Sequence, residues 1–465
     1  MSIVWLTFIS QCGELNYVAV QAEHTVVPEP PKLLRYLRKI HKYDIMPKIY
    51  RQRVGLTRRN TMKTIKYTLN ETDCNYQFPQ DISKICFFDI ETTGLSPKAS
   101  SLYMIGIMYF NKAENNFEIV QWFADTRISE PQIINTFLEA LESFDYLYHF
   151  NGKTFDIPYI LNKCDKYAIP FTPHTEKLLG DSTGTYSIDI LAQIRPLKKS
   201  LGISKANQTA LEQWLGIFRE DKYDGGMLIK DYSEYLQKKL LKPDEAPELE
   251  KLLLLHNHDD MAGMLSVVNI MSYKDFFQAP EIFNIFITAL DFDEEENLQI
   301  HFSHSCKPPK PAIIQKAFPD SKIGLGDDFV LQMKVYLDDS EGILCVPSLK
   351  GILKTFFDNY KDYYYIPEAD TAVLKSVGEI YDKSIRKRAA ASTCYTKKEG
   401  IFIPSMTLSP LHTLNASKST PAQGADIRQF FLAYKDKICF YELPDHKTDE
   451  DFFERYLIGQ LKCLL

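Results

Sequence analysis

The stretch Ile85-Cys-Phe-Phe-Asp-Ile-Glu-Thr-Thr-Gly-Leu95 decides how this chain folds. Its apolar first half predicts a buried strand, and its glycine predicts the turn that ends the strand. Side chains alternate along a strand, so Asp89 and Glu91 point to one face while Ile90 points to the other. Two carboxylates on a buried strand are unfavourable unless a cation compensates their charge. The stretch therefore predicts a strand that binds metal.

The residues that follow alternate between strand and helix patterns. Ser129 is the expected N-cap of the first helix, because apolar side chains recur at helical spacing after it. The expected elements are strands at 85–90, 103–110, 117–123 and 145–150, and helices at 129–141, 155–167 and 248–271. This order predicts an α/β fold with a mixed sheet flanked by helices.

Two further acidic residues lie in patterns that suit the same site. In Asn151-Gly-Lys-Thr-Phe-Asp156 the Asn-Gly pair turns the chain after a strand, and Asp156 opens the next helix, where the helix dipole favours a carboxylate. His256 and Asp260 lie four residues apart on the long helix and share a face. The spacing of Asp259 also fits, and Asp260 is the preferred ligand. For any one of these residues a solvated position is the commoner fate, so the prediction rests on the set.

Length and composition indicate a globular chain with more than one domain. Of its 465 residues, 45% are hydrophobic and 13% aromatic, which is enough to bury more than one core. The nine cysteines form no Cys-x-x-Cys pair, which argues against a zinc site or a disulfide framework and for a reducing, cytoplasmic compartment. Neither a signal peptide nor a membrane span is expected, and no membrane partner.

The formal net charge of −7 does not exclude a polyanionic partner, because bound divalent ions reverse the local sign of charge. Residues 1–61 are basic, with ten Lys and Arg against four Asp and Glu. One interpretation of these residues is a basic arm for nucleic acid. The other is a weakly structured extension, or even an upstream translation artefact with Met62 as the natural start. Two folded domains are expected after it, at 62–275 and 276–465.

The second of these domains is expected to be a smaller α+β domain with no assigned function. Its expected strands lie at 285–292, 298–303, 329–337 and 343–347. Tyr363-Tyr-Tyr365 then leads into an expected helix that ends in the basic run Arg386-Lys-Arg388. Aromatic side chains beside a basic run suit a nucleic-acid platform. Core tyrosines beside a solvated helix end are the preferred interpretation.

Three motifs together resemble the exonuclease motifs of the DEDD superfamily, whose members have a ribonuclease H-like fold. They are Phe88-Asp-Ile-Glu-Thr-Thr-Gly-Leu95, Asn151-Gly-Lys-Thr-Phe-Asp-Ile-Pro158 and His256-Asn-His-Asp-Asp260. The resemblance is greatest to the YprB-type ribonuclease H-like proteins of bacteria and covers about 80–275. It implies a 3'-5' exonuclease that hydrolyses phosphodiester bonds of DNA or RNA, with single-stranded 3' ends as substrate.

The resemblance also implies roles for individual residues. Two Mg²⁺ or Mn²⁺ ions would be held by carboxylates, with Asp89 bridging them and Glu91, Asp156 and Asp260 completing the shell. His256 lies four residues before Asp260, where members of the family have a tyrosine. DEDD members with a histidine place that histidine five residues before the last acid, a position that Leu255 occupies here. The role of His256 is therefore open between a general base or water-orienting group and a hydrogen-bond partner of a ligand carboxylate.

Substrate contacts are less clear from the sequence. Lys153 would contact a phosphate and Phe155 would stack on a terminal base, or they are a solvated loop lysine and a core aromatic residue. Two alternative functions also stay open. One is a catalytically weak nucleic-acid-binding module in which the unusual third motif has lost its base, and the other is a ribonuclease H-like endonuclease.

Overall fold

The structure is a computed structural model that describes residues 4–9, 15–20, 62–69, 74–219, 225–318, 331–407, 428–444 and 449–465. The chain forms two compact units, Met1–Arg51 and Gln52–Leu465. In the first unit, strands β1 (Val4–Ile9) and β2 (Leu15–Val20) pair antiparallel. The rest of the predicted basic extension lies outside the described residues.

A six-stranded sheet with the order β3-β6-β5-β4-β7-β8 is the frame of the candidate site. Strands β3 to β6 pair antiparallel, whereas β7 and β8 run parallel to β4. This arrangement confirms the predicted mixed sheet. The strands are β3 (Met62–Leu69), β4 (Ile85–Thr92), β5 (Leu102–Asn111), β6 (Asn116–Ala124), β7 (Tyr146–His149) and β8 (Ser187–Asp189).

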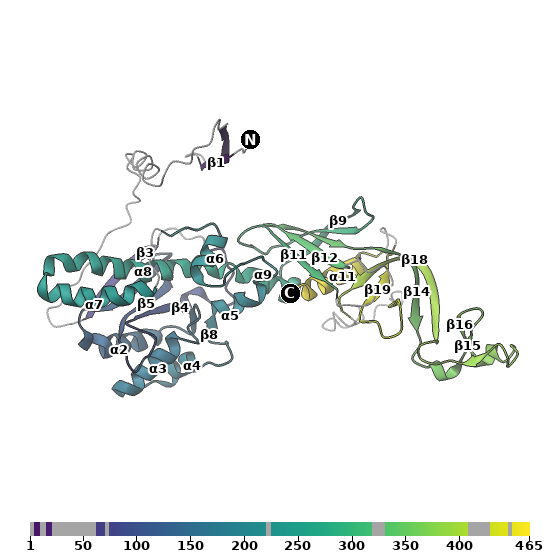
Figure 1. Cartoon of the computed structure of the whole chain (residues 1–465), viewed down its shortest axis with the longest axis horizontal. Coiled ribbons are helices and arrows are strands. Elements are labelled where there is room, and N and C mark those ends of the chain that lie inside the picture. The colour runs from purple at the N-terminus through teal and green to yellow at the C-terminus, as the bar shows by residue number, and fades with distance from the viewer. Residues whose placement is uncertain are drawn as a thin grey trace. The chain divides into compact units, whose positions relative to one another are not determined.

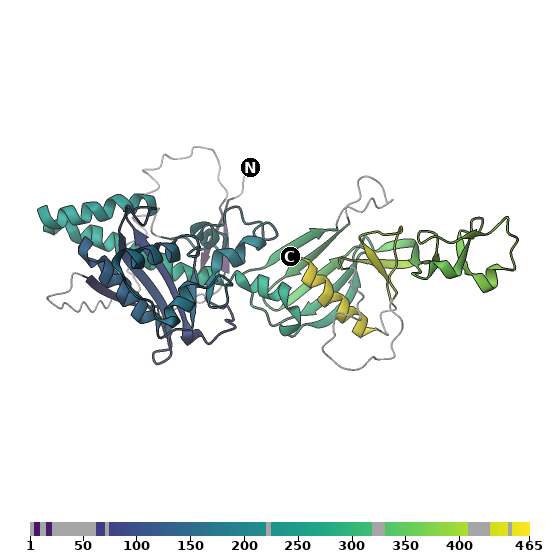
Figure 2. The ribbon, with the colours of Figure 1, turned by 90° about the horizontal axis from the view of Figure 1, so that it is seen from below.

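Helices cover both faces of this sheet (Figures 1 and 2). Cys86 and Phe88 of β4 face α2 and α3, and the rings of Phe88 and Phe137 lie 5.3 Å apart. The opposite face of β4 packs against α8, as Phe87 shares a core with Met261. The helices are α2 (Glu130–Leu141), α3 (Asp156–Tyr167), α4 (Pro173–Leu179), α5 (Ile190–Ile194), α6 (Gln208–Trp214), α7 (Gly225–Leu241), α8 (Ala246–Val268) and α9 (Met271–Gln278).

The single long helix predicted at 248–271 is wrong at its end, because α8 stops at Val268 and α9 starts at Met271. Asn269 lies at the break and is buried. Its side-chain oxygen accepts a 2.8 Å hydrogen bond from the backbone N–H of Asn75. This bond ties the break to the segment before β4. None of the helices in the described ranges is both long and apolar enough to cross a membrane.

The remainder of the second unit is mostly antiparallel strand, which confirms the predicted α+β class. A five-stranded sheet has the order β11-β12-β13-β10-β9, and two three-stranded sheets follow, β14-β18-β19 and β16-β15-β17. Helix α11 (Glu450–Cys463) ends the chain. The strands of the first two sheets are β9 (Phe286–Phe292), β10 (Leu298–Ser303), β11 (Ala312–Ala317), β12 (Gln332–Leu337), β13 (Glu341–Val346), β14 (Leu349–Phe356), β18 (Tyr395–Ser405) and β19 (Cys439–Glu442).

The predicted helix that ends at Arg386-Lys-Arg388 is wrong. Strands β15 (Tyr363–Ile366) and β16 (Thr371–Leu374), a short α10 (Lys375–Gly378) and β17 (Lys387–Arg388) occupy this region. The guanidinium of Arg386 lies 4.6 Å from the ring centroid of Tyr364 and donates to the carbonyl of Gly378. These tertiary contacts hold the basic run extended, because a cation packs well on an aromatic face.

Candidate active site

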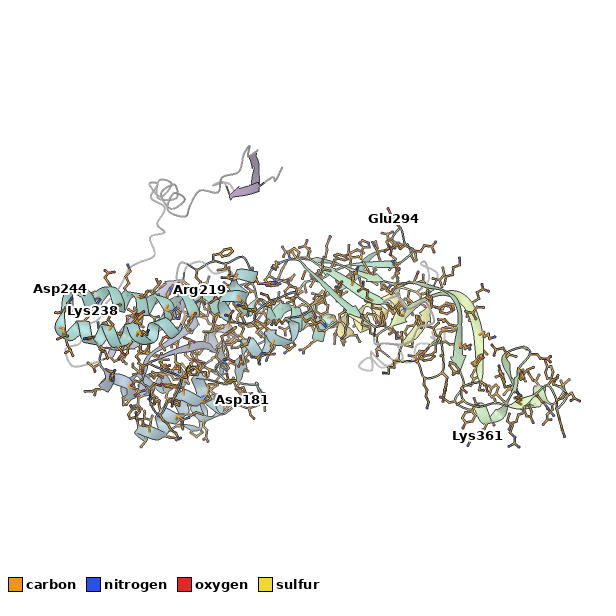
Figure 3. The ribbon with its side chains drawn as sticks, in the orientation of Figure 1. Asp181, Arg219, Lys238, Asp244, Glu294 and Lys361 are labelled. Carbon is orange, nitrogen blue, oxygen red and sulfur yellow. The ribbon has the colours of Figure 1, made fainter. Side chains whose placement is uncertain are left out.

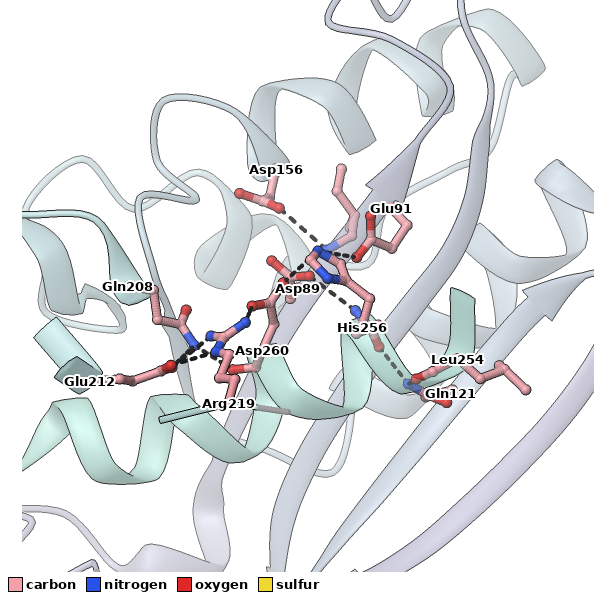
Figure 4. A network of polar contacts seen from close by, with 12 residues as sticks. Asp89, Glu91, Gln121, Asp156, Gln208, Glu212, Arg219, Leu254, His256 and Asp260 are labelled. Atoms are coloured by element: carbon pink, nitrogen blue, oxygen red, sulfur yellow. Dashed lines mark hydrogen bonds and ion pairs between the residues drawn. The ribbon is translucent and has the colours of Figure 1, made fainter. Parts of the chain in front are cut away.

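The four predicted acids come together where β4 ends, between the sheet and α8 (Figure 4). Asp89 and Glu91 lie on β4, and Asp156 is the first residue of α3. Asp156 accepts a 3.3 Å hydrogen bond from the backbone N–H of Ile90, which brings α3 to the strand. Asp260 enters the cluster from α8.

His256 lies between two of these acids. Its Nε2 atom is 3.3 Å from Asp260 Oδ2 and 3.9 Å from Glu91 Oε1. One ligand atom from each of Glu91, His256 and Asp260 lies within 4.8 Å of the others. Asp259, the competing acid of the sequence prediction, instead lies 3.1 Å from Nδ1 of His258.

A glycine on β5 lets α8 approach the acids closely. Gly106 is the cross-strand partner of both Asp89 and Gln121. A Cβ atom there would lie 2.1 Å from Asn257 Oδ1. Asn257 is fully buried, accepts a 3.0 Å hydrogen bond from Gln121, and donates one of 3.0 Å to Asp89 Oδ2. Asn257 therefore orients the Asp89 carboxylate from the space that the glycine leaves.

The second oxygen of Asp260 is held by an arginine. Nη1 of Arg219 donates to Asp260 Oδ1 at 2.5 Å, while its Nη2 donates to Glu212 Oε1 at 2.6 Å and its Nε to Glu212 Oε2. Gln208 also binds both acids, at 2.7 Å from the Asp260 carbonyl and 3.1 Å from Glu212 Oε1. Figure 3 labels Arg219 in the whole chain, and Figure 4 shows its guanidinium between Glu212 and Asp260.

The cluster raises the pKa values of three carboxyl groups. Burial, then the charges of Asp156, Asp260 and Glu91, raise the pKa of Asp89 well above its usual value. Burial raises the pKa of Glu91 to about 8, although His256 opposes the shift. Burial also raises the pKa of Asp156 to about 7. Crowded, buried carboxylates favour their neutral forms, so a bound cation would displace protons here.

A buried His–Ser pair beside Asp156 is structural. Nδ1 of His149 accepts a 3.0 Å hydrogen bond from the backbone N–H of Gly152, so its proton is on Nε2, which is 3.1 Å from Ser187 Oγ. Burial lowers the pKa of His149 to about 4. Asp189 adds a negative charge that raises the pKa of Asp156. With Nε2 as donor, the imidazole does not activate the serine as a base.

The loop after β4 is tied down by a buried ion pair. Lys163 of α3 and Glu130 of α2 are both buried, and Lys163 Nζ lies 2.8 Å from Glu130 Oε1. Lys163 also donates to the Ser100 carbonyl at 2.5 Å, and Glu130 accepts from the backbone N–H of Leu102 at 2.7 Å. The pair thus fixes the end of the loop that begins beside Glu91.

The predicted substrate contacts, Lys153 and Phe155, lie in the turn before Asp156. Lys153 is exposed, and its ammonium donates to the Ser182 carbonyl at 2.7 Å. The Phe155 ring is half-buried and lies 5.6 Å from the Tyr159 ring. The structure brings neither side chain into contact with the four acids, and their contact with a substrate stays a prediction.

Sequence reasoning missed the groups that hold the acids in place, namely Gln121, Glu212, Arg219 and Asn257. Asn257 lies inside the third motif. The signal in the sequence was the glycine within the strand, Gly106, because a strand glycine often marks the close approach of another group, here Asn257. For the ion pair of Glu212 and Arg219 the sequence carries no periodic signal, because tertiary packing brings the pair to Asp260.

Comparisons with solved structures show low similarity over parts of the chain. A family B DNA polymerase from Pyrobaculum calidifontis has 13% identity, a TM-score of 0.32 and coverage of 62% of this chain. E. coli ExoI bound to single-stranded DNA has 12% identity, a TM-score of 0.23 and 50% coverage. Exonuclease I from Methylocaldum szegediense has 14% identity, a TM-score of 0.24 and 56% coverage. The chain covers 36%, 54% and 64% of those structures respectively, less than two thirds of each.

Comparison with curated proteins returned no match. A family model of the RNase_H superfamily matches residues 86–272. The matched residues run from the second residue of β4 to the start of α9, so they include all four clustered acids. Residues 86–272 therefore match the RNase_H superfamily in sequence. Their mixed sheet, with helices on both faces, has the ribonuclease H-like fold.

Proposed function

We propose that the chain is a metal-dependent nuclease that hydrolyses phosphodiester bonds of DNA or RNA as a 3'-5' exonuclease. The observation that carries this proposal is the gathering of Asp89, Glu91, Asp156 and Asp260 around His256. Buried anions at this density are costly without cations. The ribonuclease H-like fold of 86–272 supports a nuclease but hosts several kinds. The DEDD class and the relation to YprB-type proteins are part of the proposal.

The donor set fits Mg²⁺ or Mn²⁺. Both ions prefer carboxylate oxygens, which the four acids supply. Glu91, His256 and Asp260 already present ligand atoms within 4.8 Å of one another. Asp89 and Asp156 extend the set, and the four carboxylates would hold the two ions that the motif resemblance implies. When bound, the ions would supply an activated water and neutralise charge on the leaving oxygen.

The residues of this chain orient the site in three ways. Asn257 holds Asp89, the backbone N–H of Ile90 holds Asp156, and Arg219 holds Asp260. His256 contacts carboxylates on both sides. These distances favour the role of a carboxylate partner over that of a general base, of the two roles left open by the sequence.

The position of His256 also supports the second candidate, a nucleic-acid-binding module with weak catalysis. If the imidazole serves only the carboxylates, the site lacks the water-orienting group that the family's tyrosine would supply. The exonuclease and the binding module then predict different rates of hydrolysis but the same binding of nucleic acid. An endonuclease would differ from both in its products.

Product analysis distinguishes these functions. The purified chain is incubated with 5'-labelled single-stranded DNA and RNA in Mg²⁺, Mn²⁺ or EDTA. A ladder that shortens from the 3' end only with metal supports the exonuclease. Retained binding without products supports the binding module, and internal fragments support the endonuclease.

Two variants control this experiment. Asp156→Ala removes one of the clustered carboxylates and should give no products. Asp259→Asn changes the neighbouring acid that lies against His258 and should give wild-type products. Equal turnover of Asp156→Ala and the wild type would refute the proposed site.

A further inference from the structure

We infer that Arg219 is a positioning residue that holds one oxygen of Asp260, so that only the other oxygen is presented to a metal ion. This inference rests on the proposed function and names a residue that acts on the metal site through Asp260. Within the part of the chain that the structure describes, the side-chain hydrogen bonds of Arg219 go to Glu212 and Asp260 and to none of the other three acids.

The direction of the Arg219 guanidinium is fixed by Glu212. Nε and Nη2, which form one edge of the planar group, both bind the Glu212 carboxylate. That bidentate pairing leaves Nη1 directed at Asp260 Oδ1. The side chains of Arg219 and Glu212 are only 9% and 1% exposed, so water competes little for these bonds.

Glu212 is in turn fixed by the contact between α6 and α8. A Cβ atom on Gly263 would lie 2.0 Å from Glu212 Oε1, so the missing side chain makes room for the carboxylate. Gln208 bridges the same helices, because its amide donates to Glu212 and to the Asp260 carbonyl. The arginine is therefore held by a packed helix pair on the far side of Asp260 from His256.

The two carboxylate oxygens of Asp260 therefore have different partners. Oδ1 is bonded to Arg219, whereas Oδ2 faces His256 Nε2 at 3.3 Å. A carboxylate held this way offers a metal one oxygen in one orientation. Outer groups that orient a ligand typically contribute about 10–100-fold to metal affinity.

A purely electrostatic role for Arg219 predicts the opposite result. A cation beside a ligand carboxylate repels a metal ion, so its removal should raise metal affinity. If Arg219 positions Asp260, its removal should lower metal affinity in spite of the gain in negative charge. The sign of the change separates the two roles.

The experiment is calorimetric titration of Mn²⁺ into the full chain after removal of metal with EDTA. We expect Arg219→Gln to weaken Mn²⁺ binding about 10-fold or more. Arg219→Lys keeps the positive charge but has no planar guanidinium to bind Glu212 and Asp260 together, so it should also weaken Mn²⁺ binding. Arg455→Gln is the matched control, because Arg455 forms an ion pair with Asp451 within α11, and it should bind like the wild type.

Mn²⁺ affinity of Arg219→Gln equal to or above that of the wild type would overturn the inference, as would full retention of affinity in Arg219→Lys. If Arg219→Gln does not fold, Glu212→Gln makes the same test. It loses one of the two hydrogen bonds that hold the Arg219 guanidinium, so it should weaken Mn²⁺ binding. A wild-type chain that binds no Mn²⁺ would refute the proposed metal site itself, which distinguishes that failure from a failure of the inference.

Discussion

Gly106→Ala tests whether the close approach of α8 to β5 holds Asp89 in place. The added Cβ would lie 2.1 Å from Asn257 Oδ1 and 3.0 Å from its Cγ. Asn257 is fully buried, so its amide must move and give up its bonds to Gln121 and Asp89. The substitution therefore reaches the Asp89 carboxylate, which it does not touch.

The size of the effect follows from three terms. Overpacking a core costs about 1–3 kcal/mol, and leaving a buried polar group unpaired costs about 1–3 kcal/mol. The lower chain entropy of alanine returns about 0.5–1 kcal/mol. Together these terms lower the free energy of unfolding by about 1–5.5 kcal/mol. Hydrolysis should fall about 10–100-fold, because Asn257 no longer orients Asp89.

Denaturant unfolding and the hydrolysis assay measure the two effects. Gly351→Ala on β14 is the matched control, since a Cβ there meets nothing within 4 Å. It should leave hydrolysis unchanged and raise the free energy of unfolding by about 0.5–1 kcal/mol. In an Asn257→Ala background the clash is absent, so Gly106→Ala should then cost less than about 0.5 kcal/mol. Wild-type stability of Gly106→Ala, or an equal cost in both backgrounds, would show that the contact with Asn257 does not set the cost.

Three further predictions concern the acids and the second close glycine. Asp156→Ala should stay folded by circular dichroism yet release no product, whereas Asp259→Asn should match the wild type. The raised pKa values of Glu91, about 8, and Asp156, about 7, mean that these two carboxyl groups bind more protons in the folded state than in the unfolded chain up to about pH 8. Buried His149, whose pKa is lowered to about 4, has the opposite effect below its ordinary pKa of about 6.5. Stability without metal should therefore fall as pH rises from about 6.5 to 8; thermal melts should show the slope, and a flat profile there would count against the burial of these acids. Gly263→Ala would normally stabilise a helix by about 1 kcal/mol; here its Cβ would strike Glu212, so melts should show a loss and titration a weaker Mn²⁺ affinity.

Local patterns in the sequence predicted the acids and the sheet that carries them. The alternation around Asp89 and Glu91 needs only the geometry of one strand, and the Asn-Gly turn before Asp156 is an equally local signal. Strands β3 and β8 escaped prediction. β8 has only the three residues Ser187–Asp189, and β3 is an edge strand with weakly apolar alternation.

Tertiary contacts decided what local patterns missed. The basic run at Arg386-Lys-Arg388 has good helix formers, yet the packing of Arg386 on Tyr364 holds it beside a strand. The pair of Glu212 and Arg219 depends on how α6 meets α8, which no spacing in the sequence reports. Propensity is a weak guide wherever such contacts compete with it.

The third motif is best understood as a helix face that serves three partners at once. His256 faces Glu91, Asn257 faces Asp89, and Asp260 faces Arg219. Positions i, i+1 and i+4 lie on one side of a helix, so these contacts move together if α8 shifts. Gly106 and Gly263 set the depth of α8 on its two neighbours, the sheet and α6. A methyl group at either glycine should consequently disturb metal binding as well as packing, although neither residue lies among the acids.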